Sequence, residues 1–167
     1  EITVTDTSVY IGEITPPFLG SIQPTVTLFD RLRATALFSL NYGNKLYDSG
    51  ERMRCQGGQS RARNDPTTPL DEQARCVAAA AHGVVGGLIH DASFTKLREL
   101  SFTYDLPQTW ANAARMRKGS VTLAGQNLYT WTDYPGIDPD VSSRGTNFST
   151  VDYLQPASRR VWILRVN

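Results

Sequence analysis

Few residues in this sequence have the types and spacing needed for chemistry. Its two histidines, His82 and His90, follow Cys76 at spacings that fit no common zinc pattern, so we interpret them as ordinary loop residues. The nucleophile-elbow, phosphate-loop and His-Glu-x-x-His motifs do not occur. We therefore predict that the chain is not an enzyme and that it uses no metal or cofactor.

Three aspartates near the end of the sequence form the other candidate site. Asp133, Asp138 and Asp140 offer carboxylate oxygens, which are the ligands that Ca²⁺ prefers. The segment between them also contains two prolines and a glycine, which are typical of a turn. We favour a plain turn over a calcium site.

The two cysteines, Cys55 and Cys76, have two possible states. They form a disulfide, or they stay as unpaired thiols in a reducing compartment. A disulfide would close a loop of about 20 residues and stabilise the fold by about 3 kcal/mol through lost chain entropy. We favour the disulfide, because the segment around both cysteines is polar and has little other means of holding a shape.

The composition limits the classes of protein to which the chain can belong. Its 167 residues suit one domain, and 40% apolar with 20% charged residues is close to the average for folded proteins. The formal net charge is +1, and lysines and arginines are scattered among acids. A basic stripe of the kind that binds nucleic acid is therefore not expected.

Membrane insertion through a helix is excluded, because no run of about 18 apolar residues occurs. A spanning strand needs only about 9–11 residues of alternating polarity, so insertion through strands stays open. The first six residues have neither the basic start nor the apolar core of a signal peptide. If the chain is exported, we expect its first residue to be internal to a longer precursor.

Alternation of polar and apolar residues is the dominant pattern, and it predicts β-strands. The strands are expected near 22–29, 32–42, 94–106, 120–131 and 159–167. Short turns follow the first and third strands, and long loops over 43–92 and 133–157 follow the second and fourth. Short turns at one end and long loops at the other are typical of an outer-membrane barrel. We therefore predict an all-β fold of antiparallel up-and-down strands.

One short helix is expected inside the first long loop. Thr68 suits the N-cap, Pro69 suits the first helical position, and Asp71 and Glu72 suit the positive end of the helix dipole. Gly83 can end the helix. This helix would contain Cys76.

The aromatic residues are expected to lie at two depths. If the long loops are outside, four aromatics fall near the outer rim and two near the inner rim, as in the aromatic girdles of membrane interfaces. The outer set is Phe94, Tyr129, Trp131 and Trp162, and the inner set is Tyr104 and Trp110. The alternative is a soluble sheet that buries the same rings in a core.

Two longer segments resemble a known family. Residues 91–107 contain an Ala-Ser-Phe strand start and end in Tyr-Asp-Leu-Pro, and residues 123–140 contain Gly-Gln-Asn-Leu-Tyr-Thr followed by Tyr-Pro-Gly-Ile-Asp-Pro. Both are similar, in order and spacing, to the C-terminal part of SusC/RagA-family TonB-linked outer-membrane transporters. Residues 9–12 and 42–47 also look like family segments. The resemblance covers nearly the whole chain.

The resemblance implies the last five strands of a large outer-membrane β-barrel. A full member of the family has a plug inside the barrel, imports oligosaccharides or peptides with energy from TonB, and carries a SusD-like lipoprotein at the surface. Five strands cannot close, since single-chain barrels have at least eight. The chain is therefore expected to need the rest of the barrel, the plug and outer-membrane lipid, and the last residues of the family pattern are expected to follow Asn167.

The loops supply candidates for substrate contact and leave an alternative open. Four loop residues could stack on or hydrogen-bond a sugar or a peptide: Tyr134, Asp138, Asn147 and Tyr153. An open sheet also exposes two strand edges, which can pair with other copies. The alternative function is therefore a barrel-derived fragment that self-assembles into an extracellular fibre or structural assembly. A soluble, carbohydrate-binding β-sandwich is a third hypothesis.

Overall fold

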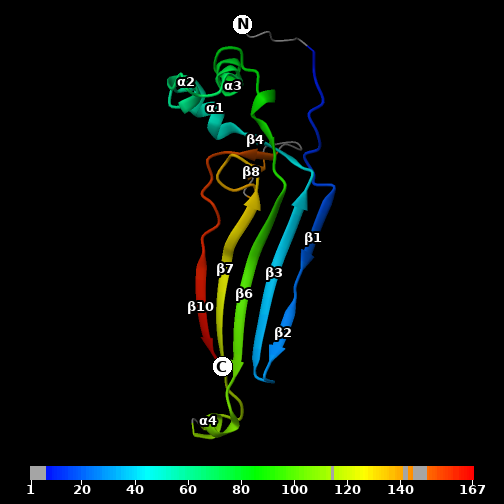
Figure 1. Ribbon diagram of the computed structural model, residues 1–167, viewed down its shortest axis with the longest axis vertical. Helices are drawn as coiled ribbons and strands as arrows, with labels where there is room; N and C mark the ends of the chain where they lie inside the picture. Colours follow the sequence, from blue (N-terminus) through cyan, green and yellow to red (C-terminus); the bar gives the residue numbers. More distant parts are fainter. Residues whose placement is uncertain (1–6, 114, 141–142, 145–149) are drawn as a thin grey trace. The chain divides into compact units, whose positions relative to one another are not determined.

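The computed structural model of the chain describes residues 7–113, 115–140, 143–144 and 150–167 (Figure 1). The chain divides into two compact units. We call Leu19–Leu40, Phe94–Trp131 and Ser158–Asn167 the sheet unit, and Glu1–Phe18, Asn41–Ser93 and Thr132–Ala157 the loop unit. Asn147 lies outside the described residues.

The sheet unit is built from one six-stranded sheet. Its strands are β1 (Phe18–Ile22), β2 (Thr25–Leu28), β3 (Leu32–Tyr42), β6 (Phe94–Asp105), β7 (Ser120–Thr132) and β10 (Val161–Val166). The order in the sheet is β1-β3-β6-β7-β10, and β2 also pairs with β3. Neighbouring strands run in opposite directions (Figure 1). The predicted fold class of antiparallel up-and-down strands is confirmed.

The first expected strand is interrupted, and the cause is Pro24. The run predicted near 22–29 forms two strands, β1 and β2, with Gln23 and Pro24 between them. Proline has no N–H to donate to a ladder, so it interrupts pairing or is confined to an edge. The carbonyl of Pro24 still accepts a bond from the Ala36 N–H of β3 at 3.1 Å.

The hairpin between β2 and β3 closes through a left-handed turn. Phe29 and Asp30 have φ angles of 52° and 56°, and the Arg31 N–H donates to the Leu28 carbonyl at 3.2 Å. Two successive positive φ angles match the right-handed twist of the flanking strands. The connection between β6 and β7 is longer than this turn and contains the six-residue helix α4 (Gln108–Ala113).

The register of β7 and β10 places apolar residues side by side. Trp162 lies opposite Gly125, Leu164 opposite Leu123, and Val166 opposite Val121. A Cβ on Gly125 would lie 2.9 Å from the ring of Trp162, so glycine at this position leaves room for the indole. The absence of a side chain at Gly125 therefore allows the Trp162 ring to lie over this position.

In its described residues, the loop unit contains three α-helices, a 3₁₀ turn and a second, four-stranded sheet. The helices are α1 (Ser49–Gln56), α2 (Arg61–Asn64) and α3 (Leu70–Ala81), with η1 (Gly86–Leu88) after them. The sheet has the order β5-β4-β9-β8, formed by β4 (Lys45–Asp48), β5 (Ile89–Asp91), β8 (Ser143–Arg144) and β9 (Thr150–Asp152). The strand β4 pairs antiparallel with β5 and parallel with β9.

The expected helix in the first long loop is α3. Its first turn carries Asp71 and Glu72, and Pro69 stands at the cap position in place of the predicted Thr68. Leu46, Ala92 and Tyr134 form one cluster of buried side chains in the core of this unit. Among the described residues, none of the helices has the length and apolar character needed to cross a membrane.

Candidate functional site

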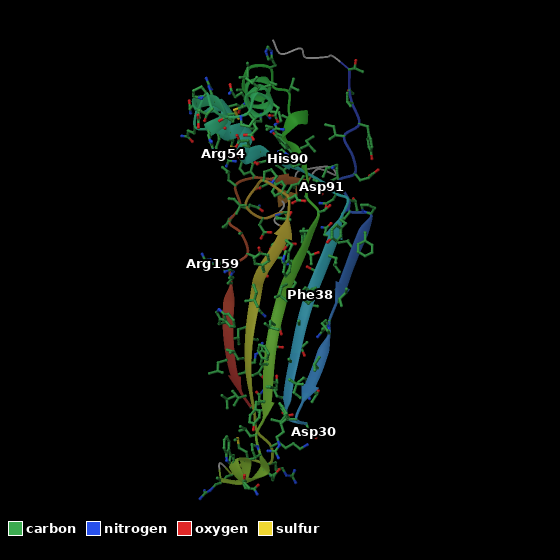
Figure 2. All side chains as sticks on the ribbon, in the orientation of Figure 1. Asp30, Phe38, Arg54, His90, Asp91 and Arg159 are labelled. Atoms are coloured by element: carbon green, nitrogen blue, oxygen red, sulfur yellow. A yellow bond between two sulfur atoms is a disulfide. The ribbon has the colours of Figure 1, made fainter. Side chains whose placement is uncertain are left out.

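The loop unit encloses a pocket of about 580 Å³ between its helices and the segment that follows β7. Its wall is formed by α1, the start of α2, α3, the residues from Leu88 to His90, and Asp133 with Pro135. Pockets that bind small molecules usually have volumes of about 300–1,000 Å³. Arg54 and His90, both labelled in Figure 2, belong to this wall.

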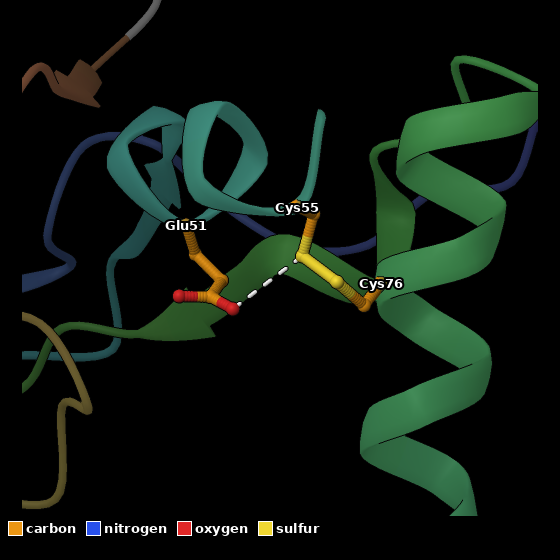
Figure 3. A group of neighbouring side chains, drawn as sticks. All are labelled: Glu51, Cys55 and Cys76. Carbon is orange, nitrogen blue, oxygen red and sulfur yellow. Dashed lines mark hydrogen bonds between the residues drawn. A yellow bond between two sulfur atoms is a disulfide. The ribbon is translucent and has the colours of Figure 1, made fainter. Parts of the chain in front are cut away.

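A disulfide between Cys55 of α1 and Cys76 of α3 closes one side of the pocket (Figure 3). The disulfide predicted from the sequence is therefore present. The carboxylate of Glu51 lies 3.4 Å from the Cys55 sulfur. A disulfide sulfur carries no proton, so this is a contact and not a hydrogen bond. Since both sulfurs are oxidised, Glu51, Cys55 and Cys76 do not offer the thiolates that a zinc site needs.

Glu51 joins α1 to the residues before α2. One carboxylate oxygen accepts from the Ser60 hydroxyl at 2.6 Å, and the other accepts from Arg54 Nε at 2.8 Å. Ser60 is buried and caps α2 by accepting from the Ala62 N–H. Ser60 is buried, which shields its bond to Glu51 from competing water. The Arg54 side chain is 41% exposed, so water weakens its pair with Glu51.

Asp48 lies at the end of β4 and caps α1. Its Oδ1 accepts from the Glu51 N–H at 2.7 Å, which is the usual role of an aspartate at an N-cap. Its Oδ2 lies 3.8 Å from an Arg54 nitrogen. Asp48 is only 4% exposed and lines the pocket. Burial of a charged carboxylate is costly unless the carboxylate is paired. For Asp48, the positive charge of Arg54 and the N-terminus of α1 offset this cost.

Next to Asp48, the side chains of Tyr134 and Asp152 form a buried hydrogen-bonded pair. The Tyr134 hydroxyl donates to Asp152 Oδ2 at 3.0 Å, and Asp152 stands directly opposite Asp48 in the parallel pairing of β4 with β9. Burial raises the pKa of the Tyr134 hydroxyl, and the negative charges of Asp48 and Asp152 raise it further. The hydroxyl therefore stays protonated and donates to the carboxylate.

Two more groups around the pocket have shifted pKa values. Burial raises the pKa of the Asp152 carboxyl, the bond from Tyr134 opposes the rise, and the charge of Asp48 adds to it. Partial burial lowers the pKa of His90, and the nearby negative charge of Asp48 opposes this. The His90 ring also packs against Tyr134 edge to face, with 6.3 Å between the ring centres. His90 is therefore neutral at neutral pH.

The residues predicted for substrate contact are placed in different surroundings. Tyr134 is 6% exposed and belongs to the core, so its ring face is not at the surface. Asp138 is also buried, and its carboxylate accepts from the Asp140 N–H at 3.1 Å, the geometry of an aspartate turn. Tyr153 is exposed, and Asn147 lies outside the described residues. Their contact with substrate stays a prediction.

The predicted interface aromatics differ in exposure. Phe94 is 3% exposed, whereas the other five are each more than a third exposed: Tyr104, Trp110, Tyr129, Trp131 and Trp162. Within the sheet unit, the rings of Tyr129 and Trp131 are tilted to one another with 4.7 Å between their centres, and the Phe38 ring lies 6.3 Å from that of Trp131. Their position at a membrane interface stays a prediction.

No motif in the sequence predicts Asp48, Glu51 or Ser60 as site residues, and the spacing of His90 predicts an ordinary loop residue. One signal was available. An aspartate followed three residues later by a glutamate, as in Asp48 and Glu51, is typical of a helix start. It would have predicted α1 but not the pocket.

Comparisons with known proteins agree with the fold. No protein-family model matches the chain. It is 39% identical over 59 residues to TonB-dependent receptor P3 of Formosa agariphila, a match that covers 35% of this chain and 6% of that protein. It is 22% identical over 156 residues to TonB-dependent receptor P26 of the same organism, covering 87% of this chain and 16% of that protein.

Solved structures of a RagAB importer share the same fold. The structure of the RagAB peptide transporter aligns with a TM-score of 0.68 and 22% identity, over 92% of this chain and 17% of that chain. The RagAB peptide importer in its "closed-closed" state aligns with a TM-score of 0.66 and 20% identity, over 98% and 18%. The chain thus spans less than a fifth of the length of the proteins it matches. The resemblance to SusC/RagA-type transporters is confirmed.

Proposed function

We propose that this chain forms part of the wall and of the outer loops of a TonB-dependent importer in a bacterial outer membrane. The observation that carries the proposal is the alignment of 92% and 98% of the chain with two of the RagAB structures. Such a wall separates lipid from an interior, so its two faces should differ in polarity.

The contacts within the sheet unit support two faces of different polarity. On one face, the hydroxyls of Thr103 and Thr122 lie 2.9 Å apart, and Gln126 donates to Glu99 at 3.4 Å. The opposite face of β7 and β10 carries the half-buried Val121 and four exposed apolar side chains: Leu123, Trp162, Leu164 and Val166. Lipid would cover this apolar face. Contact of the same face with water would carry a high free-energy cost.

The remaining partners come from the resemblance and belong to the same proposal. The rest of the barrel and the plug would complete the wall, TonB would supply energy, and a SusD-like lipoprotein would cover the outer loops. The cargo would be an oligosaccharide or a peptide, and Tyr134, Asp138, Asn147 and Tyr153 would contribute to its contact. The self-assembly alternative stays a prediction.

Fractionation of the native source tests the proposal. An antibody against residues 43–92 should detect a polypeptide several times longer than 167 residues in the outer-membrane fraction. Loss of that polypeptide should abolish uptake of the cargo and leave general membrane integrity unchanged. A free 167-residue species in a soluble or fibrous fraction would contradict the importer and support self-assembly.

A further inference from the structure

The connection between β6 and β7 concentrates positive charge at one end of the sheet unit. We call residues 107–119 the basic turn. It contains Arg115, Arg117 and Lys118 and no aspartate or glutamate. All three cations are exposed, and none has an ion pair within the part of the chain that the structure describes. Their charge can therefore act on a partner outside the chain.

Hydrogen bonds give the basic turn a defined shape. The Leu106 N–H donates to the Gly119 carbonyl at 2.8 Å, which closes the turn at the ends of β6 and β7. Inside the turn, the side-chain amide of Gln108 donates to the Arg117 carbonyl at 3.2 Å. The three cations are thus presented by a folded turn and not by an open loop.

Arg115 occupies a backbone conformation that favours another residue. It has a φ of 57° just after α4, where the Met116 N–H donates to the Ala111 carbonyl at 2.8 Å. Glycine is the usual residue at such a left-handed position, because it has no Cβ. Arg115 therefore places its charge at the end of α4 at a conformational cost.

An exposed aromatic ring accompanies these cations. Trp110 of α4 is 63% exposed. Tryptophan is enriched at membrane–water interfaces, because the indole has an apolar body and one N–H donor. Basic residues combined with an exposed tryptophan are typical of segments that lie among lipid headgroups.

The basic turn continues the apolar face of β7 and β10. Ser120 and Asn167 exchange two backbone hydrogen bonds of 2.9 and 3.0 Å, and Val121 lies opposite Val166 as the next pair. The basic turn ends at the residue before Ser120. Figure 1 shows α4 at the end of the sheet where the C-terminus lies. Cations directly beyond a lipid-covered face lie at the depth of the headgroups.

The acids at this end of the sheet unit do not cancel the charge of the basic turn. The Asp105 N–H donates to the Arg31 carbonyl at 2.9 Å, which brings the turn between β2 and β3 to the same end. That turn contains Asp30 and Arg31, whose charges offset one another. Asp105 alone then opposes the three cations. This end of the sheet unit therefore stays positive.

We infer that the basic turn binds the phosphate groups of anionic phospholipids. Its arginines and Lys118 donate N–H groups to phosphate oxygens, and the Trp110 ring lies between the headgroups and the acyl chains. Guanidinium groups suit phosphate oxygens, because they can donate two parallel hydrogen bonds. The inference rests on the proposed outer-membrane location and names a class of lipid as the partner.

Native mass spectrometry of the intact protein, purified in detergent from its native membrane, tests this inference. The probes are short-chain phosphatidylglycerol, which is anionic, and short-chain phosphatidylcholine, which is neutral overall. Phosphatidylglycerol should bind about tenfold more tightly or better, and this preference should shrink as salt is raised. Equal binding of the two lipids would overturn the inference.

Two competitors distinguish the sources of phosphate. Neither inorganic phosphate nor lipid A at the same concentration as phosphatidylglycerol should displace it from the protein. Displacement by inorganic phosphate would show a general anion site, and preferential displacement by lipid A would place the turn against the opposite leaflet. Either result would overturn the assignment to phospholipid.

A double variant locates the binding. Arg117→Gln with Lys118→Gln should weaken phosphatidylglycerol binding by about tenfold. The matched control is Arg33→Gln with Arg165→Gln, which removes two exposed cations from strands of the same unit and should leave the affinity unchanged. If the two double variants bind this lipid equally well, the basic turn is not the site.

Arg115→Gly separates charge from folding. Glycine relieves the left-handed conformation, so this variant should keep or raise the stability of the sheet unit. It should nevertheless weaken phosphatidylglycerol binding several-fold, because one cation is lost. Unchanged lipid binding in a stable Arg115→Gly variant would contradict a role for this charge.

The two proposals fail in different ways. Equal binding of both lipids by a large outer-membrane polypeptide would overturn the lipid site and leave the importer standing. A free soluble species of 167 residues would overturn the importer and, with it, the membrane position of the basic turn. Binding to isolated peptidoglycan that the Arg117 and Lys118 double variant loses, with phosphatidylglycerol binding unchanged, would assign the turn to the cell wall and overturn the lipid site alone.

Discussion

Asp152 lies opposite Asp48 inside the loop unit, and its titration should affect the stability of that unit. Burial raises the pKa of Asp152 above its ordinary 3.8, so the folded unit binds this proton more tightly than the unfolded chain. Its contribution to the free energy of unfolding is therefore complete below pH 3.8. It is lost as the pH rises through the raised pKa.

Hydrogen exchange of the β4 and β9 amides, corrected for intrinsic exchange rates, measures this contribution. The opening free energy should fall as the pH rises from 4, and Asp152→Asn should remove that slope. Asp91 gives a control of opposite sign, because bonds from Ser93 lower its pKa below 3.8. Its contribution is present above pH 3.8 and is lost as the pH falls through the lowered pKa. A slope that Asp152→Asn leaves unchanged would contradict the assignment.

The residues of the pocket show how far a sequence can predict a site. Cys55 and Cys76 could be paired from their number and surroundings alone. The pairing of Asp48 with Asp152 could not be predicted, because it depends on a parallel ladder between strands that are far apart in the sequence. Strand β9 also supplies Asp152, to which the buried hydroxyl of Tyr134, a predicted substrate contact, donates its hydrogen bond.

At the scale of elements, the disulfide joins α1 to α3, and its loss should loosen both helices. Cys55→Ala and Cys76→Ala should each lower the free energy of unfolding of the loop unit by about 3 kcal/mol, mainly through the restored freedom of the unfolded chain. The double variant should cost no more than either single variant, because all three remove one bond. Exchange of the α1 and α3 amides measures the change.

Alkylation provides the control for this prediction. In the native protein, a thiol reagent added without reductant should label neither Cys55 nor Cys76. If the costs of the two single variants add in the double variant, the cysteines act separately and the cross-link is not the source of stability.

The elements differ in how well local patterns predict them. Alternation with a period of two is a local signal, and β3, β6 and β7 are long enough to display it several times. The helix α3 carries its own first-turn acids. By contrast, α2, β8 and β9 have four residues or fewer, too short for any periodicity, and they form because neighbouring elements pair with them.

At the scale of the whole molecule, the proposed membrane location makes opposite faces of one strand pair respond differently to charge. Leu164→Arg would place a cation on the apolar face beside Leu123, and it should destabilise the protein in lipid by about 2–4 kcal/mol. Gln126→Arg adds the same charge on the polar face next to Glu99 and should change stability little. Urea unfolding in lipid vesicles measures both. Equal costs would argue against a lipid-facing sheet.

The parallel pairing of β4 with β9 also has an evolutionary consequence. It joins two segments of the chain, residues 41–93 and 132–157, into one four-stranded sheet. We expect that neither segment can be replaced alone, because an unrelated segment would not pair with the remaining strand at Tyr47 or Val151. Diversification of these loops should therefore proceed by joint exchange or by paired substitutions. A chimera that transfers both segments together should fold, whereas one that transfers a single segment should not.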